Sequence, residues 1–530
     1  MKEKLRKYGA FFLALVIIAG VYMLFANRKS GMFIDEIYTY GLSNSHYAPF
    51  LTDTMEDGSL VGKTLTRQDL LDYVYVNSGE GLDFGSVYYN QVNDVHPPLY
   101  YWLFNIASSL TPNVFSKWTG LILDFFIFML SLLVLYKLVL KLFGSHDNAA
   151  AAVILYGLSN LGLSCALMIR MYVLLTLLTL TLALLIVCLM EKPRAYLYPL
   201  VFLNIFAGLM TQYYFVFYAF FICLAYFIYA LVKKEYKPAS IFAVSALLGV
   251  GALLVAFPAC LTHLFADKLV SGGNALENLS AFGQYKERLL IFYHEVQHGL
   301  KAAVCITLVL LVGLILSYKK IGAAFKEKKI SFDSLVVIVP AFLTLVLVAI
   351  VSPVLEQRYV YNIGPIFIVA VSFLIYLLEE SWGRFNREFW VKKGILLLTA
   401  VFALEFARFI PPRYMYPEYN DYDAVMSQHS DEPCVFMTDN YFSTITEAIQ
   451  QLLYFDNFYI SNDPYSEGID DYIAGFNDAD ECVVYIDVND FWSSGYSAEE
   501  MLPQLIESTD FNSYETLYKN GLTETYLLKK

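Results

Sequence analysis

Two adjacent carboxylates stand in an otherwise apolar stretch of the sequence, GMFIDEIYTY, shortly after the first long apolar run. Asp35 and Glu36 are unusual at that place, because charged groups close to a membrane are costly unless they are solvated or functional. One interpretation is a solvated helix cap. The other is a general base, or a metal-binding acid, at the membrane surface.

A second polar group lies about 60 residues later, in the segment DVHPPLYY. Two consecutive prolines cannot lie inside a helix, but they can begin one. Asp94 and His96 are therefore expected on a rigid turn before an aromatic helix that carries Tyr100. An ordinary helix start would explain the same pattern.

Two arginines lie at the ends of apolar runs, Arg170 in RMY and Arg358 in RY. An arginine with so few polar neighbours needs an anionic partner, or must extend its side chain to the membrane interface. Guanidinium groups bind phosphate through paired hydrogen bonds. Two such arginines, near carboxylates on the same side, suggest a lipid-phosphate site.

The segment HEVQH fits the HExxH pattern, in which two histidines one helical turn apart bind zinc and the glutamate acts as a base. The residues are His294, Glu295 and His298. A zinc protease needs a third ligand, and no downstream pattern supplies one. The favoured interpretation is a surface helix that contributes polar groups to an outer cavity, with structural zinc as an alternative.

Composition indicates that membrane helices position these residues. The chain has 530 residues, of which 58% are hydrophobic and 16% charged, against about 45–50% and about 25% in soluble domains. Disordered, coiled-coil and collagenous chains are excluded, as is an ordinary soluble enzyme. The net charge of −13 argues against nucleic-acid binding, which needs basic surfaces.

Apolar runs of about 17–25 residues recur and predict a polytopic α-helical membrane protein with about eleven transmembrane helices. Lys and Arg concentrate in the short loops that a cytoplasmic N-terminus would place inside, so the C-terminus is expected outside. The first run resembles a signal peptide without a clear cleavage site and is expected to remain as a helix. The predicted spans are 8–26, 117–141, 150–167, 171–190, 195–211, 213–232, 239–261, 301–317, 334–352, 360–378 and 394–410.

The sequence predicts two domains. Residues 1–410 form the membrane domain, with outer loops at 27–98 and 262–300, and residues 411–530 form an extracytoplasmic α/β domain. The second domain holds 4 Lys+Arg against 23 Asp+Glu, so it carries most of the acidity. Whether Cys434 and Cys482 pair is left open. The elements expected here are strands at 434–438, 458–461 and 482–487, helices at 443–453 and 498–507, and a terminal hairpin turning at Asn520-Gly521.

The order of these motifs resembles that of bacterial glycosyltransferases with the GT-C fold, relatives of the protein O-mannosyltransferases and of the lipid A aminoarabinose transferase. The resemblance covers about residues 1–410 and depends on DEIYT and DVHPPLYY, followed by RMY, TQYYF and RY. Gln212 stands in TQYYF where relatives often have histidine, so any role of that histidine is not carried over.

The resemblance implies transfer of a sugar from a polyprenyl-phosphate donor to an acceptor hydroxyl on the extracytoplasmic face, with inversion. The implied catalytic residues are Asp35, as general base, and Glu36. The implied donor-phosphate residues are Arg170, Arg358 and Tyr359. The implied substrate-orienting residues are Asp94, His96, Tyr100, Tyr172 and Tyr213, while Glu36, Asp94 and His96 could bind a metal if one is used.

No obligatory metal is expected by analogy with the lipid A-modifying relatives. The expected partners are the membrane, the lipid-linked donor and a cell-envelope or protein acceptor, and the expected location is a bacterial plasma membrane. Two alternatives come from other classes of protein. An HExxH zinc membrane protease would cleave peptides in a chelator-sensitive way, and a transporter would carry solute without needing Asp35.

Overall fold

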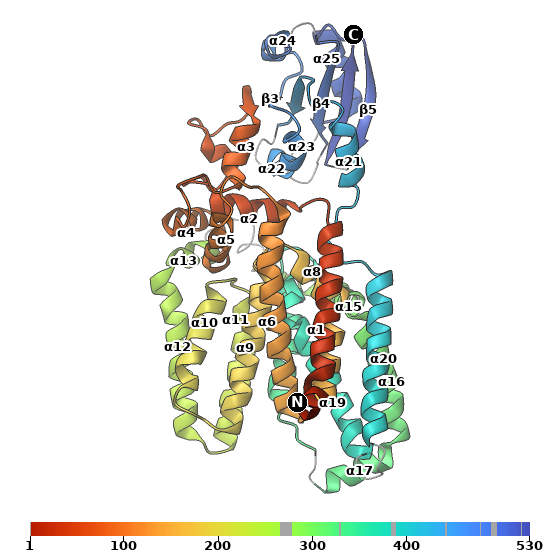
Figure 1. Ribbon diagram of the computed structural model, residues 1–530. Coiled ribbons are helices and arrows are strands. Elements are labelled where there is room, and N and C mark those ends of the chain that lie inside the picture. Colours follow the sequence, from red (N-terminus) through yellow and green to blue (C-terminus); the bar gives the residue numbers. More distant parts are fainter. Residues whose placement is uncertain are drawn as a thin grey trace. The chain divides into compact units, whose positions relative to one another are not determined.

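The computed structural model describes residues 2–265, 278–327, 330–382, 388–439, 443–476, 479–488, 496–520 and 522–530. The chain divides into two compact units (Figure 1). We call them the membrane unit and the sheet unit. The membrane unit comprises residues 1–27, 95–100 and 121–413, and the sheet unit comprises 28–94, 101–120 and 414–530.

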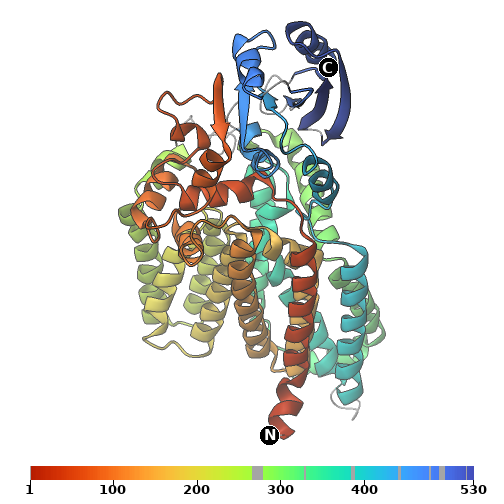
Figure 2. The ribbon, with the colours of Figure 1, turned by 45° about the horizontal axis from the view of Figure 1, so that its top comes forward.

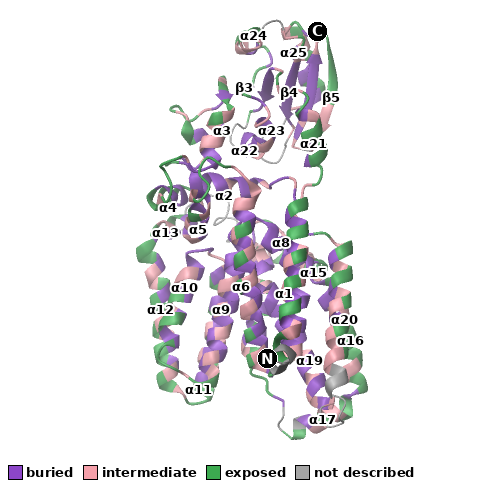
Figure 3. Cartoon of the chain, viewed as in Figure 1, coloured by how far each residue is buried: buried purple, intermediate pink, exposed green. Residues whose placement is uncertain are grey.

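The membrane unit is helical, as its long apolar segments require, since a backbone in lipid must satisfy its own hydrogen bonds. Exposed residues line α12, α16 and α20 in Figure 3, and many are large and apolar, such as Val255, Leu316 and Leu397. Such faces suit lipid rather than water. The elements are α1 (Lys2–Arg28), α6 (Lys117–Phe143), α7 (His146–Gly157), α8 (Asn160–Leu167), α9 (Tyr172–Glu191), α10 (Leu197–Leu209), α11 (Phe215–Val232), α12 (Tyr236–Ala256), α13 (Ala259–Phe265), η2 (Phe282–Gln284), α15 (Tyr285–Gly299), α16 (Lys301–Leu316), α17 (Tyr318–Lys326), α18 (Leu335–Val351), η3 (Gln357–Ile363), α19 (Gly364–Trp382) and α20 (Glu388–Phe409).

The multi-pass membrane architecture is confirmed, but the predicted number of spans is larger than the structure supports. Within the described residues, six helices are long and apolar enough to cross a membrane, or up to eight if two bent pairs each count as one span. The α7–α8 pair bends by 61°, where Ser159 caps α8 by accepting a hydrogen bond from the Gly162 amide at 2.9 Å. Helices α10 and α18 are apolar but have only 13 and 17 residues.

The sheet unit is built around a mixed six-stranded sheet with the strand order β1-β3-β2-β4-β6-β5. The predicted α/β character of the C-terminal segment is confirmed, as is its terminal hairpin, although Gly521 lies outside the described residues. Cys434 and Cys482 are free and buried. The strands are β1 (Lys63–Thr66), β2 (Cys434–Met437), β3 (Asn457–Ser461), β4 (Glu481–Asp487), β5 (Ser513–Lys519) and β6 (Thr523–Lys529).

The helices of the sheet unit come from both ends of the chain. The predicted helix at 443–453 is two short helices, and the one at 498–507 is present as a single helix. The expected short helix after Pro98 is also present. The helices are α2 (Ile34–Asn44), η1 (Leu51–Thr54), α3 (Arg67–Val74), α4 (Phe84–Asn93), α5 (Leu99–Ser109), α21 (Tyr419–Met426), α22 (Ser443–Glu447), α23 (Ile449–Leu452), α24 (Glu467–Ala474) and α25 (Ala498–Ser508).

The sheet includes one strand that the sequence did not reveal. β1 comes from the first loop and pairs antiparallel with β3, next to the blue strands in Figure 2. The pairing continues at both ends, since the Gly62 and Arg67 amides donate to the Ile460 and Asp456 carbonyls at 2.8 and 2.9 Å. The sequence predicts that the first loop belongs to the membrane domain, whereas residues 28–94 group with the C-terminal segment in one compact unit.

The β1–β3 register predicts a specific cross-link. Thr66 lies opposite Asn457, and opposed antiparallel residues have Cα atoms about 4.5–5.5 Å apart, within the range for a disulfide. The double substitution Thr66→Cys/Asn457→Cys should therefore form a disulfide under oxidising conditions. Reduction-dependent labelling by a thiol-reactive polymer measures it. The matched control, Thr66→Cys/Asp456→Cys, is shifted by one residue and should stay reduced, and equal cross-linking of both pairs would refute this register.

Candidate active site

Helix α2 positions the acidic pair, because Asp35 and Glu36 lie in its first turn. The helix begins at Ile34, shortly after α1 ends at Arg28. The Glu36 side chain turns back and accepts a hydrogen bond from the Phe33 amide at 2.7 Å, so it caps its own helix. It also accepts from the Lys29 ammonium at 2.9 Å, and both side chains are fully buried. Lys29 donates in addition to the Tyr414 carbonyl. Burial lowers the pKa of Lys29, and the charge of Glu36 opposes that change.

Glu36 and its neighbour Asp35 differ in how far they are buried. Glu36 is enclosed, whereas Asp35 is half-buried. Carboxylates that differ in this way are suited to different tasks, since a base must reach its substrate and a buried ion pair holds its surroundings in place. The geometry therefore favours Asp35 as the reactive carboxylate and Glu36 as the group that positions it.

Three carboxylates from three segments surround one tyrosine of α2. Tyr38 lies one helical turn after Asp35, and burial together with the charge of Asp35 raises its pKa. The Tyr38 hydroxyl hydrogen-bonds Thr446, and it also experiences the charges of Asp94 and Glu447. Asp94 follows α4 and caps it, its amide donating to the Asn90 carbonyl at 3.0 Å. The structure thus brings the predicted Asp35 and Asp94 into one electrostatic neighbourhood.

Glu447 is the member of this neighbourhood that the sequence did not identify. Burial, followed by the charges of Asp35 and Asp487, raises the pKa of Glu447 to about 7. The segment STITEAIQ offers one signal in retrospect, because Glu447 is a single acid among apolar and hydroxyl side chains. Without knowledge of which segment it faces, that pattern is indistinguishable from an ordinary amphipathic helix.

The DVHPPLYY motif crosses the boundary between the two units. Asp94 ends a segment of the sheet unit, and His96, which is half-buried, belongs to the membrane unit. The prolines are followed directly by α5, as expected. Tyr100 is fully buried and donates to Asp124 Oδ1 of α6 at 2.8 Å. Tyr100 therefore joins α5 to α6. Asp124, the buried residue that it contacts, is not among the residues predicted from the sequence.

The two predicted phosphate-binding arginines lie on adjoining segments of the membrane unit. Arg170 stands in the break between α8 and α9 and is only 3% exposed. Arg358 lies in η3, which packs against both α8 and α9. Tyr172 at the start of α9 meets Tyr361 of η3 edge to face, with ring centroids 5.9 Å apart. Two cations from distant parts of the sequence are thus carried by neighbouring elements.

Aromatic rings and one carboxylate surround Arg358. Its Nε lies 3.1 Å from Glu356 Oε2, and its guanidinium carbon lies 5.6 Å from the ring centroid of Tyr359. Tyr359 in turn meets Tyr214 edge to face at 5.2 Å. In the same TQYYF segment, the Tyr213 hydroxyl lies 2.9 Å from His263 Nδ1. These contacts fix the arginine and both predicted tyrosines in defined orientations.

The HExxH segment lies on α15, and its glutamate makes contacts that a zinc-site base would not make. Glu295 accepts from the Arg413 guanidinium at 2.5 Å, and its backbone carbonyl accepts from Gln357 Nε2 at 3.0 Å. Across the described residues, no group of three potential ligands that could hold a metal includes His294 or His298. The zinc-protease alternative is therefore not supported. Instead, α15 packs against η3 and braces the segment that carries Arg358.

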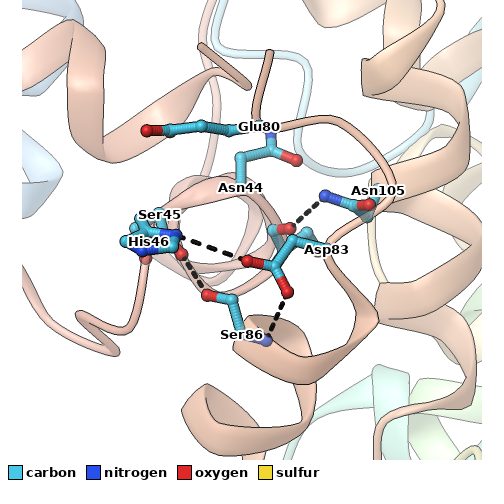
Figure 4. Close-up of a pocket in the computed structure, with 8 residues that line it drawn as sticks. Asn44, Ser45, His46, Glu80, Asp83, Ser86 and Asn105 are labelled. Atoms are coloured by element: carbon cyan, nitrogen blue, oxygen red, sulfur yellow. Dashed lines mark hydrogen bonds and ion pairs between the residues drawn. The ribbon is translucent and has the colours of Figure 1, made fainter.

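A polar hollow in the sheet unit lies apart from the predicted site residues (Figure 4). His46 and Asp83 approach to 3.3 Å beside it, and the Ser86 amide donates to Asp83 at 2.9 Å. The Ser86 hydroxyl donates to the Ser45 carbonyl. The hollow is built from the caps and turns that join α2 to α4, so its polar groups serve the local fold.

Comparisons with known proteins agree with this architecture. Residues 95–264 match the family described as dolichyl-phosphate-mannose-protein mannosyltransferase. Among curated proteins, none matches the sequence. The fold is similar to the crystal structure of ArnT from Cupriavidus metallidurans bound to undecaprenyl phosphate, with 11% identity, 98% of each chain covered and a TM-score of 0.51. The apo form of that protein gives 10% identity, 98% coverage of each chain and a TM-score of 0.49.

An oligosaccharyltransferase from Archaeoglobus fulgidus is also similar, with 13% identity, 98% of this chain and 74% of that chain covered, and a TM-score of 0.47. The family match contains the segment VHPPLYY, from Val95 on, together with RMY and TQYYF. The likeness in fold to ArnT extends over the membrane unit and the sheet unit alike. The chain is therefore a multi-pass membrane protein with an ArnT-like GT-C fold, and its residues 95–264 match the dolichyl-phosphate-mannose-protein mannosyltransferase family.

Proposed function

We propose that the protein is a glycosyltransferase that moves a sugar from a polyprenyl-phosphate donor to an acceptor hydroxyl at the extracytoplasmic face of a bacterial plasma membrane, and that it inverts the anomeric configuration. The family description names a dolichyl-phosphate sugar, and the ArnT structure holds undecaprenyl phosphate. Both are polyisoprenyl phosphates. The observation that carries the proposal is Asp35, half-buried on α2 and held there by the buried Lys29–Glu36 pair.

Asp35 acts as the general base in this proposal. It takes the proton of the acceptor hydroxyl while that oxygen forms a bond to the anomeric carbon. The bond from the anomeric carbon to the phosphate oxygen breaks, and its electron pair remains on the lipid phosphate. Because attack and departure occur on opposite faces of the sugar, the configuration inverts. No metal is required in this step. Asp94, His96, Tyr172 and Tyr213 orient the substrates.

Arg170, Arg358 and Tyr359 hold the phosphate of the donor. Guanidinium groups remain charged at any physiological pH and offer paired donors that match phosphate oxygens. Their attraction is strongest as negative charge builds on the departing phosphate, so they favour the transition state over the ground state. The distribution of Lys and Arg supports an orientation with the N-terminus in the cytoplasm and the sheet unit outside.

Removing the base should abolish transfer. Asp35→Asn keeps the shape of the side chain but cannot accept a proton, so we expect no release of labelled sugar from a polyprenyl-phosphate donor in membranes. Expression and membrane insertion should equal those of the wild type. The matched control is Glu56→Gln, which removes one exposed carboxylate from the same unit and should remain active. Near-normal transfer by Asp35→Asn would refute the assignment.

Removing one phosphate-binding arginine should weaken use of the donor. Arg358→Ala loses a charge-assisted partner of the phosphate. The value of kcat/KM for the donor should therefore fall at least roughly 30-fold, which corresponds to a loss of about 2 kcal/mol of transition-state stabilisation. Arg358→Lys should be intermediate, because it keeps the charge and loses the paired donors. Titration of the labelled donor measures the effect, with the exposed Arg194→Ala as control. Unchanged donor kinetics would remove Arg358 from the site.

The Lys29–Glu36 pair should show strong coupling in stability. Lys29→Met and Glu36→Gln each leave one buried partner uncompensated, which costs roughly 3–5 kcal/mol. The double variant removes both charges, so it should be markedly more stable than the sum of the two single effects implies. Thermal unfolding of the detergent-purified protein tests this. Additive losses would contradict a buried, coupled pair.

A further inference from the structure

The short helix α22 of the C-terminal segment packs directly against α2, the helix that carries Asp35. Thr446 of α22 hydrogen-bonds the hydroxyl of Tyr38 on α2. A second hydrogen bond lies beside this contact, where Gln450 Oε1 of α23 accepts from the amide of Met32, just before α2, at 2.8 Å. Both hydrogen bonds join the C-terminal segment to the residues immediately around Asp35. The chain segment farthest from the family match thus forms part of the surroundings of the proposed base.

The next residue of α22 is Glu447, which is half-buried and stands beside two other acids. Asp35 approaches it from α2, and Asp487 approaches it from the end of β4. The charge of Glu447 also helps to raise the pKa of three nearby tyrosines, which are Tyr38 of α2, Tyr416 before α21 and Tyr419 of α21. Burial and the charges of Asp35 and Asp487 disfavour the ionisation of Glu447, and once Glu447 is ionised its charge acts on Asp35 in turn.

Glu447 also borders a polar hollow, which gives its carboxylate access to exchange a proton. The hollow is lined by Thr444, Gln451, Asn520 and Thr523 among others. Thr444 and Gln451 are buried, and within the described residues Thr444 Oγ1 and Gln451 Oε1 have no hydrogen-bond partner. Buried polar oxygens of this kind are normally satisfied by water or a ligand hydroxyl. The hollow is therefore polar enough to hold water beside the Glu447 carboxylate, with which it could exchange a proton.

We propose that Glu447 is a positioning residue of the transfer reaction, which acts through Asp35 and makes that carboxylate a stronger base. The inference rests on the proposed function of Asp35 and extends it to the C-terminal segment. A negative charge beside a carboxylate disfavours the charged form of that carboxylate and increases its affinity for a proton. A base with greater proton affinity removes the acceptor proton more readily, provided that it is itself unprotonated.

The ionisation of Glu447 determines the dependence on pH. Glu447 ionises near neutrality, because burial and its acidic neighbours raise its pKa to about 7. Its charge then increases the proton affinity of the neighbouring Asp35 carboxylate. The value of kcat/KM for transfer should therefore rise in one step as the pH increases through about 7.

The experiment measures kcat/KM for labelled polyprenyl-phosphate sugar between pH 5 and pH 9, with the full chain in membranes that contain the natural acceptor. The wild type should show the step near pH 7. Glu447→Gln should lose the step and stay at the level of the acid form, roughly three- to tenfold below the wild type at pH 8. Glu447→Asp should restore a step, which a merely structural role would not produce.

Two further variants serve as a control and as an independent test of the role of Glu447. The matched control Glu499→Gln removes an exposed carboxylate from α25 of the same unit and should keep the wild-type profile. Asp487→Asn removes an acidic neighbour while leaving Glu447 in place, so the step should move to lower pH. This variant decides the matter if Glu447→Gln fails to fold.

The outcomes also separate this inference from the proposed function. A wild-type step that persists in Glu447→Gln, while Asp35→Asn is inactive, overturns only the role of Glu447. A step that does not move in Asp487→Asn overturns it as well. Full activity of Asp35→Asn overturns the base itself, and with it the residue through which Glu447 acts.

Discussion

The buried pair of Lys29 and Glu36 is the interaction on which the proposed site depends. Both side chains are fully enclosed, and Glu36 also caps the helix that presents Asp35. Burying two charges is costly unless their geometry is good and their remaining hydrogen-bonding capacity is used. Here the Phe33 amide and the Tyr414 carbonyl take up that capacity. The pair therefore holds the first residues of α2, and the linker at Tyr414, in one defined arrangement.

Much of this arrangement could be predicted from the sequence, because several signals are local. Two carboxylates in an apolar stretch, two prolines before an aromatic helix and long apolar runs each have a direct physical reading. Such signals located α5 and most membrane helices, but not α2. They could not separate the tasks of Asp35 and Glu36, which differ only through the enclosure of Glu36 by Lys29, a residue seven positions earlier.

What the sequence could not provide is contact between remote segments. Glu447 faces Asp35 and Asp124 meets Tyr100 only because of the tertiary structure. β1 has four residues with one buried side chain, too short a pattern to recognise. The HExxH match shows how ambiguous a short motif is, and for this reason the sequence analysis favours a surface helix there. The pattern of three residues suggests a zinc site, whereas in the structure the Glu295 carboxylate accepts from Arg413 and its backbone carbonyl accepts from the Gln357 side chain. The sequence likewise did not show which acid of the C-terminal segment lies near Asp35, and the structure identifies Glu447.

The β1–β3 pairing also constrains the order in which the protein can be made. The paired residues are roughly 400 positions apart, so β1 emerges long before its partner strand has been synthesised. During that interval the edge of β1 and the buried face of Leu65 have no sheet to join. The sheet unit is therefore completed only after the membrane helices have been inserted. Assembly of the proposed active site is thus a late event in the biogenesis of the protein.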